Sequence, residues 1–167
     1  MQPDHDNAAQ TDNDSADTKY LLFKLTGELY GSPIEGIRQV IKPPLIKSMP
    51  FMKDHFLGVT NYQGRLVSVV DLRRKFELVM KDDTPSIVLI VSTNSGPIAA
   101  VVDSIVSVSE ILAGDIDRGS LVDTKVPMEF FLGIAKTPLG LVNLINIAGT
   151  LSAEDFKTIQ ETKEKAS

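Results

Sequence analysis

Residues 56–76 read FLGVTNYQGRLVSVVDLRRKF, and residues 131–151 read FLGIAKTPLGLVNLINIAGTL. The two stretches align without a gap at a constant offset of 75 residues, and five of the 21 aligned positions are identical. The identical pairs are Phe56/Phe131, Leu57/Leu132, Gly58/Gly133, Leu66/Leu141 and Val67/Val142. A match at a fixed offset indicates one supersecondary unit used twice. The chain is therefore expected to be a scaffold with two similar halves.

The rest of the chain is typical of short β-strands separated by turns. Runs such as YLLFKLT at residues 20–26 and SIVLIVST at residues 86–93 are rich in strand formers and end in glycine-containing turns. About ten such strands favour a sandwich or a barrel, and the repeat divides them into two sets of about five. We expect an all-β protein of two packed five-stranded barrels, because closing a sheet removes its exposed edges. The approximate barrels are residues 19–80 and 81–151, allowing for strands exchanged between them.

Three segments depart from this pattern of plain strands. Residues 33–41 predict either a short helix or an irregular strand, because their isoleucines and Val40 fall at helical spacing. Residues 113–129 are polar and contain glycine and proline, which predicts a long loop. A short helical turn is expected after Asp71, whose side chain can cap it.

Two aspartates, Asp71 and Asp103, each follow a strand pattern, in VVDL and VVDS. Paired carboxylates can serve acid–base chemistry, but capping a turn at a strand end is the expected role. The second copy of the repeat has Asn146 in the place of Asp71, and Asn caps a turn but cannot act as a base. The expected structural turn and cap positions are Gly58, Gly64, Asp71, Asp103, Gly133 and Asn146.

Groups that usually carry catalysis or hold cofactors are missing from the sequence. The chain has no Cys and two His, His5 and His55, so neither a thiolate nucleophile nor a usual zinc ligand set can be assembled. The sequence contains no phosphate-binding loop, dinucleotide fingerprint or nucleophile elbow. We therefore expect a protein that is not an enzyme and that binds no metal or cofactor.

The net charge of −5 comes from one end of the chain. Residues 1–18 contain five aspartates and no Lys or Arg, which predicts a disordered acidic tail, either a solvated leader or an interaction arm. Of the 22 acidic residues, the remaining 17 match the 17 basic ones, and the longest basic run is Arg73-Arg74-Lys75. A neutral body without a basic patch argues against nucleic acid as a partner.

The start of the chain and the length of its apolar runs bear on its location. The first residues have neither a basic nor an apolar region of a signal peptide, and no apolar run is long enough to span a bilayer. We therefore expect a cytoplasmic protein without direct membrane insertion.

Residues 152–167 begin with Ser152 and two acids, and Phe156 and Ile159 give them an apolar stripe. This pattern predicts a C-terminal helix packed over an opening, with a frayed end.

Several ordered motifs resemble those of the CheW family of chemotaxis coupling proteins. They are GVTNYQGRLVSVVDLRRKF at 58–76, IAAVVDSIVSV at 98–108, and FLGIA with LGLVNLINI in the second copy. The likeness covers residues 19–157 and includes a first hairpin at residues 20–41. It implies two packed SH3-like barrels of five strands each. It also implies a non-catalytic adaptor that couples the cytoplasmic tip of a methyl-accepting chemoreceptor to the regulatory domain of a CheA-type histidine kinase.

The resemblance also implies two binding sites. Family receptors present a helical hairpin, which implies a helix bound in an apolar groove between the barrels. Motif position assigns four residues to this receptor groove: Ile37, Asn61, Gln63 and Ile87. For kinase docking we nominate Leu45 and Ile46. The alternative for each apolar residue is ordinary packing in the core or between strands, because burial is the default for isoleucine.

Three residues depart from the family pattern. The family usually has Arg in the place of Gln63 and Leu in the place of Tyr62, and many members have Pro in the place of Ser68. Gln cannot replace the charge and the bidentate fork of Arg. An alternative is therefore a divergent CheW-like paralogue. Such a paralogue would serve a pilus-motility or other chemosensory-like pathway, or would bind the kinase without supporting its activation.

Overall fold

The protein consists of two β-sheets that pack on each other. The computed structural model describes residues 18–82, 84–119, 126 and 128–151. The first sheet contains β3 (Ile37–Ile41), β4 (Phe56–Tyr62), β5 (Arg65–Asp71), β6 (Ile87–Thr93) and β7 (Gly96–Val102). The second sheet contains β1 (Thr18–Leu25), β2 (Glu28–Pro33), β8 (Ser104–Ile111), β9 (Ile116–Asp117), β10 (Phe131–Thr137) and β11 (Gly140–Ile145). The short helices are η1 (Ile34–Gly36), α2 (Leu72–Lys75), η2 (Ala113–Asp115), η3 (Met128–Phe130) and α3 (Ile147–Thr150).

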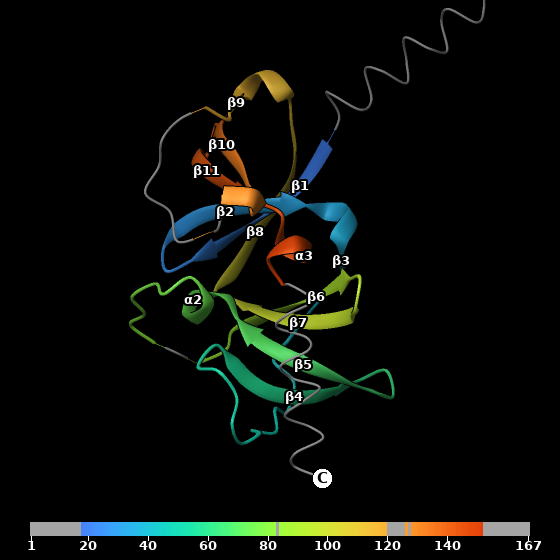
Figure 1. Ribbon diagram of the computed structural model, residues 1–167. Coiled ribbons are helices and arrows are strands. Elements are labelled where there is room, and N and C mark those ends of the chain that lie inside the picture. Colours follow the sequence, from blue (N-terminus) through green and yellow to red (C-terminus); the bar gives the residue numbers. More distant parts are fainter. Residues whose placement is uncertain (1–17, 83, 120–125, 127, 152–167) are drawn as a thin grey trace, which may run out of the picture.

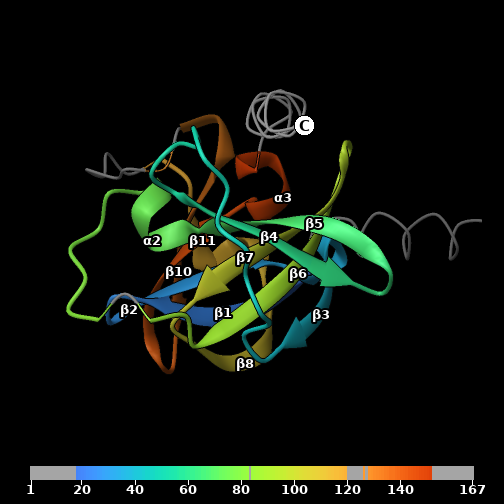
Figure 2. The same cartoon turned by 90° about the horizontal axis from the view of Figure 1, so that it is seen from below.

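The strand order places the two sheets one above the other in Figure 1. It is β3-β6-β7-β5-β4 in the first sheet and β8-β1-β2-β11-β10-β9 in the second. Figure 2 shows α3 on one face of the molecule and β3 and β8 toward the opposite face. The predicted fold class, all-β with two packed barrel-like halves and short helical turns, is confirmed.

Alternate residues of the inner strands belong to two different apolar cores. In β6, Val88 and Ile90 pack inside the first barrel, whereas Leu89 and Val91 face the second sheet. Strand β1 alternates in the same way between the interior of the second barrel and the interface. The cluster between the sheets is called the central cluster, and its buried members include Leu21, Phe23, Val70, Leu89, Val91 and Ile145. Because both faces of these strands are buried, they read as nearly continuous apolar runs in the sequence.

The repeated sequence forms the same unit twice, a hairpin followed by a short helix. A register shift lies at the same place in both hairpins, between Phe56 and Gly58 in β4 and between Phe131 and Gly133 in β10. The second strand of each hairpin also pairs in parallel with a strand from outside the unit, β5 with β7 and β11 with β2. The two copies are therefore equivalent in backbone pairing as well as in sequence.

Neither sheet is a continuous half of the chain. Strands β1 and β2 lie in the second sheet beside β8 and β11, and β6 and β7 lie in the first sheet beside β3 and β5. The approximate halves 19–80 and 81–151 therefore exchange their first two strands. The chain crosses between the sheets twice as a result, from β2 through η1 to β3 and from β7 to β8.

In two segments the structure goes beyond the prediction from the sequence. Residues 33–41 contain both proposed forms, the short helix η1 and then β3. The loop prediction for residues 113–129 was wrong at β9, which pairs with β10 and gives the second sheet its sixth strand. A two-residue strand is too short to carry a periodic signal. Its counterpart in the first sheet is the isolated bridge between Lys47 and Val59.

The predictions for both ends of the chain fall largely outside the described residues. Residues 1–17 and 152–167 are not among them, whereas Thr18 is the first residue of β1. Within the described part of the chain, no helix is long and apolar enough to cross a membrane.

Candidate functional site

A buried arginine brings together the two aspartates at the strand ends, Asp71 and Asp103. Arg73, in the single turn of α2, is 1% exposed. Its guanidinium binds Asp71 twice, Nε to Oδ1 at 3.0 Å and Nη2 to Oδ2 at 2.9 Å, and Nη1 reaches Asp103 Oδ1 at 2.7 Å. The hydrogen bond to Asp71 is the main cause that raises the pKa of Arg73, against the opposing effect of burial. The two carboxylates are therefore joined through a permanent cation.

This arrangement accounts for the aspartates as structural groups. Asp71 Oδ1 also accepts a hydrogen bond of 2.9 Å from the backbone N–H of Arg73 and so caps α2. Asn146 caps α3 in the same way, through the backbone N–H of Gly149 at 3.1 Å. Asp103 contacts a different turn, because its carboxylate accepts from the N–H of Thr26 in the β1–β2 hairpin. Among the described residues, no three or more His, Asp or Glu lie together in a way that could hold a metal ion.

Two glycines of the repeat permit a neighbouring backbone to approach closely. Gly58 and Gly133 have φ of +143° and +135°. A Cβ on Gly58 would lie 2.1 Å from the carbonyl O of Lys47, and one on Gly133 would lie 2.8 Å from that of Asp117. Gly64 has φ of +81° in the β4–β5 turn, with open space around it. The first two positions therefore require glycine for space as well as for backbone conformation.

The two candidate groove isoleucines lie at the rim of the central cluster. Ile37 and Ile87 are both half-buried and pack against this cluster. Ile37 pairs with Val91, four positions along β6 from Ile87, which corresponds to about 13 Å along the strand. Ile105 of β8 was not predicted, and it packs against the same cluster from the second sheet. Strands β3 and β8 are edge strands of different sheets on the same side of the molecule (Figure 2), so Ile37 and Ile105 pack on the central cluster from two facing edges.

The candidate polar residues Asn61 and Gln63 lie at the tip of the β4–β5 hairpin. The Oδ1 of Asn61 accepts a hydrogen bond of 3.1 Å from the backbone at the end of the turn. Gln63 is exposed and has φ of +51°. Next to it, the hydroxyl of Tyr62 donates a hydrogen bond to Gln39 Oε1. This bond joins the two edge strands of the first sheet and brings the hairpin tip to Gln39, two residues along β3 from Ile37.

The two nominated kinase-docking residues face opposite ways. Leu45 is 95% exposed, and its carbonyl O accepts a hydrogen bond of 2.7 Å from Thr60 Oγ1. Ile46 packs against the apolar interior of the first barrel. The side chain of Leu45 is therefore accessible at the surface, whereas that of Ile46 belongs to the packing of the first barrel.

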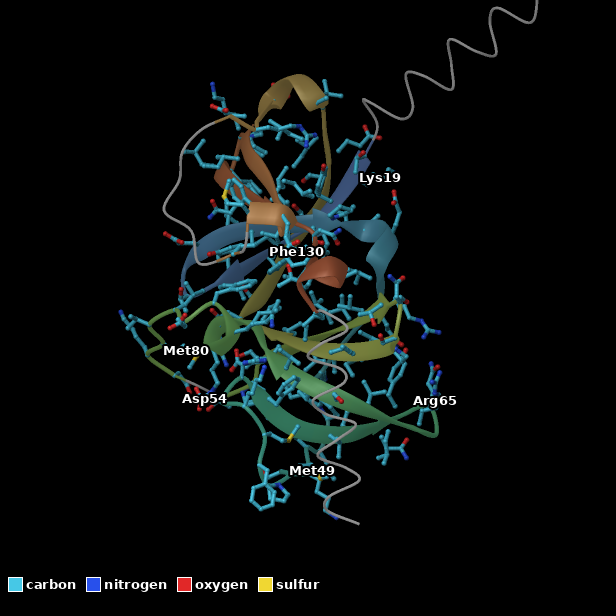
Figure 3. The ribbon with its side chains drawn as sticks, in the orientation of Figure 1. Lys19, Met49, Asp54, Arg65, Met80 and Phe130 are labelled. Atoms are coloured by element: carbon cyan, nitrogen blue, oxygen red, sulfur yellow. The ribbon has the colours of Figure 1, made fainter. Side chains whose placement is uncertain are left out.

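A cleft of about 450 Å³ opens between the sheets at the first crossover. Residues of β2, η1, β6 and α3 line it, among them Ser32, Gly36, Ser92 and Ala148. Phe130, at the end of η3, lies next to α3 (Figure 3), and its ring would meet a Cβ added at Gly149. The cleft is therefore bounded on one side by the second copy of the repeated unit.

Sequence reasoning missed Arg73, Gln39 and Ile105. A signal for the arginine was present, because Asp71-Leu72-Arg73 in the first copy corresponds to Asn146-Ile147-Ala148 in the second. The carboxylate and the arginine are thus lost together between the copies. Neither Gln39 nor Ile105 had such a signal, because their importance depends on strands that are distant in the sequence.

Two small barrels packed through one apolar interface define the structural class of this protein. The family model described as a CheW-like domain matches residues 19–155. The chain therefore belongs to the CheW family of chemotaxis adaptor proteins. The resemblance inferred from its motifs is confirmed.

Individual relatives agree with this assignment. The chemotaxis protein CheW of Klebsiella aerogenes is 24% identical over 142 residues, covering 84% of this chain and 86% of that protein. The chemotaxis protein CheW of Helicobacter pylori is 28% identical over 109 residues, covering 65% of this chain and 66% of that protein. The crystal structure of the scaffolding protein TtCheW from Thermoanaerobacter tengcongensis matches with a TM-score of 0.74 and 26% identity. This match covers 83% of this chain and 95% of that one.

Proposed function

We propose that this protein couples chemoreceptors to a CheA-type histidine kinase in cytoplasmic arrays, without catalysing a reaction or using a cofactor. Membership of the CheW family supports a role as a chemotaxis adaptor. The observation that carries the proposal is the placement of Ile37 and Ile105. These half-buried isoleucines come from edge strands of different sheets and pack on one apolar cluster.

A helix with one apolar face suits such a site. The apolar face of a receptor helix would cover the exposed parts of Ile37 and Ile105 and would extend the central cluster. Gln39 on β3 and Gln63 in the β4–β5 turn are exposed, and we expect their amides to meet polar groups flanking that face. Ile87 lies farther along β6 and would contribute only at the rim.

The substitution Ile37→Glu tests the receptor groove. A carboxylate at this half-buried position would lose its hydration when a helix covers it, and we expect the affinity for the soluble cytoplasmic hairpin of a receptor to fall by about tenfold or more. Val79→Glu is the control, because Val79 is 90% exposed in the segment after α2. If Ile37→Glu keeps its circular dichroism spectrum and binds as wild type does, the groove assignment is wrong.

For the kinase, we propose docking through the exposed side chain of Leu45. Leu45→Asp should reduce retention of the CheA-type kinase on the immobilised protein while receptor binding remains. A matching change at Ile46 would instead be expected to disturb the first barrel, because that side chain packs inside it. Unchanged kinase retention by Leu45→Asp would contradict this docking site.

A paralogue that binds the kinase without supporting its activation is the second candidate, and Gln63 favours it. An exposed amide stands where the family pattern has a fixed positive charge. Kinase activity in reconstituted arrays separates the two functions, since activation by wild type would exclude a purely inhibitory role. Kinase retention gained only with Gln63→Arg would indicate a changed partner, such as the kinase of a pilus-motility system.

A further inference from the structure

Asp103 is the single residue by which the chain crosses from the first sheet to the second. Strand β7 ends at Val102 and β8 begins at Ser104. The backbone N–H of Asp103 donates to the carbonyl O of Lys24 at 3.0 Å, and its carboxylate accepts a hydrogen bond from the N–H of Thr26. Both contacts bind the crossover to the β1–β2 hairpin of the second sheet.

Arg73 holds the same crossover from the side of the first sheet. Its Nη1 lies 2.7 Å from Asp103 Oδ1 and 3.2 Å from the carbonyl O of Asp82. The rest of the guanidinium is fixed by two hydrogen bonds to Asp71, at the end of β5. Because the donors of a planar guanidinium point in fixed directions, these bonds define where Asp103 lies relative to β5.

The second copy of the repeat shows that the unit itself does not require this arginine. There Asn146 caps α3, and Ala148 stands at the position that corresponds to Arg73. At the other crossover, from β2 to β3, a Cβ on Gly36 would lie 3.4 Å from that of Ala148. The cleft of about 450 Å³ opens beside this contact. One crossover is therefore held by an ion pair between the buried Arg73 and the partly exposed Asp103, and the other meets a small side chain at the edge of a cleft.

We propose that Arg73 is a positioning residue. Through Asp103 it sets the place of β8, and with it Ile105, relative to Ile37 on β3. The inference rests on the proposed function, because these two isoleucines are the receptor surface proposed above. Ile105 follows Asp103 by two residues, and Ile37 lies on the sheet to which Arg73 belongs. Buried ion pairs contribute weakly to net stability, and in some proteins they specify the arrangement of the parts that they join.

The distance between two spin labels, one on each sheet, measures this arrangement directly. The chain has no native Cys, so Lys19→Cys and Arg65→Cys introduce the labelling sites. Both positions are exposed, Lys19 on β1 of the second sheet and Arg65 on β5 of the first, and Figure 3 shows them at the surface of the molecule. Double electron–electron resonance then gives the distribution of distances between the sheets.

The test variant combines Asp71→Asn with Arg73→Ala, which copies the Asn and Ala of the second repeat and leaves no unpaired carboxylate at position 71. Arg74→Ala is the control, because it also replaces an arginine of the same helix by alanine. The contacts of Arg74 with carboxylates include one of 3.5 Å to Asp54 and one of 3.8 Å to Asp71. We expect the test variant to broaden the distance distribution and to weaken binding of the receptor hairpin by about tenfold. The control should change neither.

A test variant with the wild-type distance distribution, losing thermal stability alone, would show that Arg73 stabilises the fold without positioning β8. If wild type itself fails to bind the receptor hairpin, the proposed function fails, whereas the distances still decide the role of Arg73. Asp103→Asn replaces the double variant as the test variant if the double variant does not fold. In wild type, Arg73 and Thr26 donate to different oxygens of Asp103, and in Asp103→Asn the amide NH2 would replace one of these oxygens and face a donor. An unchanged distribution in this variant would also overturn the inference.

Discussion

Asp71 and Asn146 occupy the same position in the two copies of the repeat and cap the same kind of short helix. Their backbones are also held alike, since the N–H of Asp71 donates to the carbonyl O of His55 and that of Asn146 to the carbonyl O of Phe130, each at 2.8 Å. The ion pair with Arg73 is found in the first copy, where the second has Ala148. Asp71 is thus a helix cap that also anchors a buried cation.

The two caps are expected to differ in their importance. Asn146→Ala removes the acceptor for the backbone N–H of Gly149 and should lower the free energy of unfolding by about 1 kcal/mol. Asp71→Asn keeps a capping oxygen but breaks a buried ion pair, and should lower it by about 3 kcal/mol or more. Urea denaturation measures both changes. Equal losses would show that the ion pair adds nothing to the cap.

The glycines of the hairpins should not be equivalent. Gly58→Ala forces a side chain toward the carbonyl O of Lys47 as well as into a positive φ. Gly64→Ala also places a side chain at a positive φ, but in open space. It should lower the free energy of unfolding by about 1 kcal/mol. We expect Gly58→Ala to lower the midpoint of urea denaturation clearly more than Gly64→Ala does. Similar midpoints would mean that the segment at Lys47 moves aside readily.

The contact between Tyr62 and Gln39 can be tested by a double-mutant cycle. Tyr62→Phe and Gln39→Ala each remove one partner of the hydrogen bond that joins β4 to β3. Each should lower the free energy of unfolding by about 1 kcal/mol, and the double variant should lose less than the sum. Fully additive losses would indicate that the bond does not form in solution.

Burial of Tyr30 predicts a loss of stability at alkaline pH. Desolvation by burial and, to a smaller extent, the nearby charge of Glu28 raise the pKa of Tyr30 above its usual value of 10.0. Since the folded pKa is the higher one, the full stability is present below pH 10 and is lost as the pH rises toward the folded pKa. Tyr30→Phe should flatten this decline while retaining the stacking with Phe23 and Phe76. The slope of the free energy of unfolding against pH, measured between about pH 9 and 11, tests this prediction. An unchanged slope in Tyr30→Phe would contradict it.

Local features of the fold could be predicted from the sequence because they depend on neighbouring residues. The hairpins, the turn at Gly64 and the caps at Asp71 and Asn146 all follow from short-range conformational preferences and hydrogen bonds. The constant offset between the copies predicted two similar halves without any long-range information. Strand β9 could not be found in this way, because its two residues are too few for a periodic pattern and pair with β10, which is distant in the sequence.

The sequence by itself therefore determined the strands, the repeated unit and the family of this protein. The tertiary structure decided which strands share a sheet, which arginine of the run at 73–75 is buried, and which isoleucines pack on the central cluster. These outcomes depend on contacts such as Arg73 with Asp103, 30 residues apart, and Thr26 with Asp103, 77 residues apart. No periodic pattern specifies such pairs. They form because the two sheets bury one apolar cluster between them, and the buried charges must then find partners across that interface.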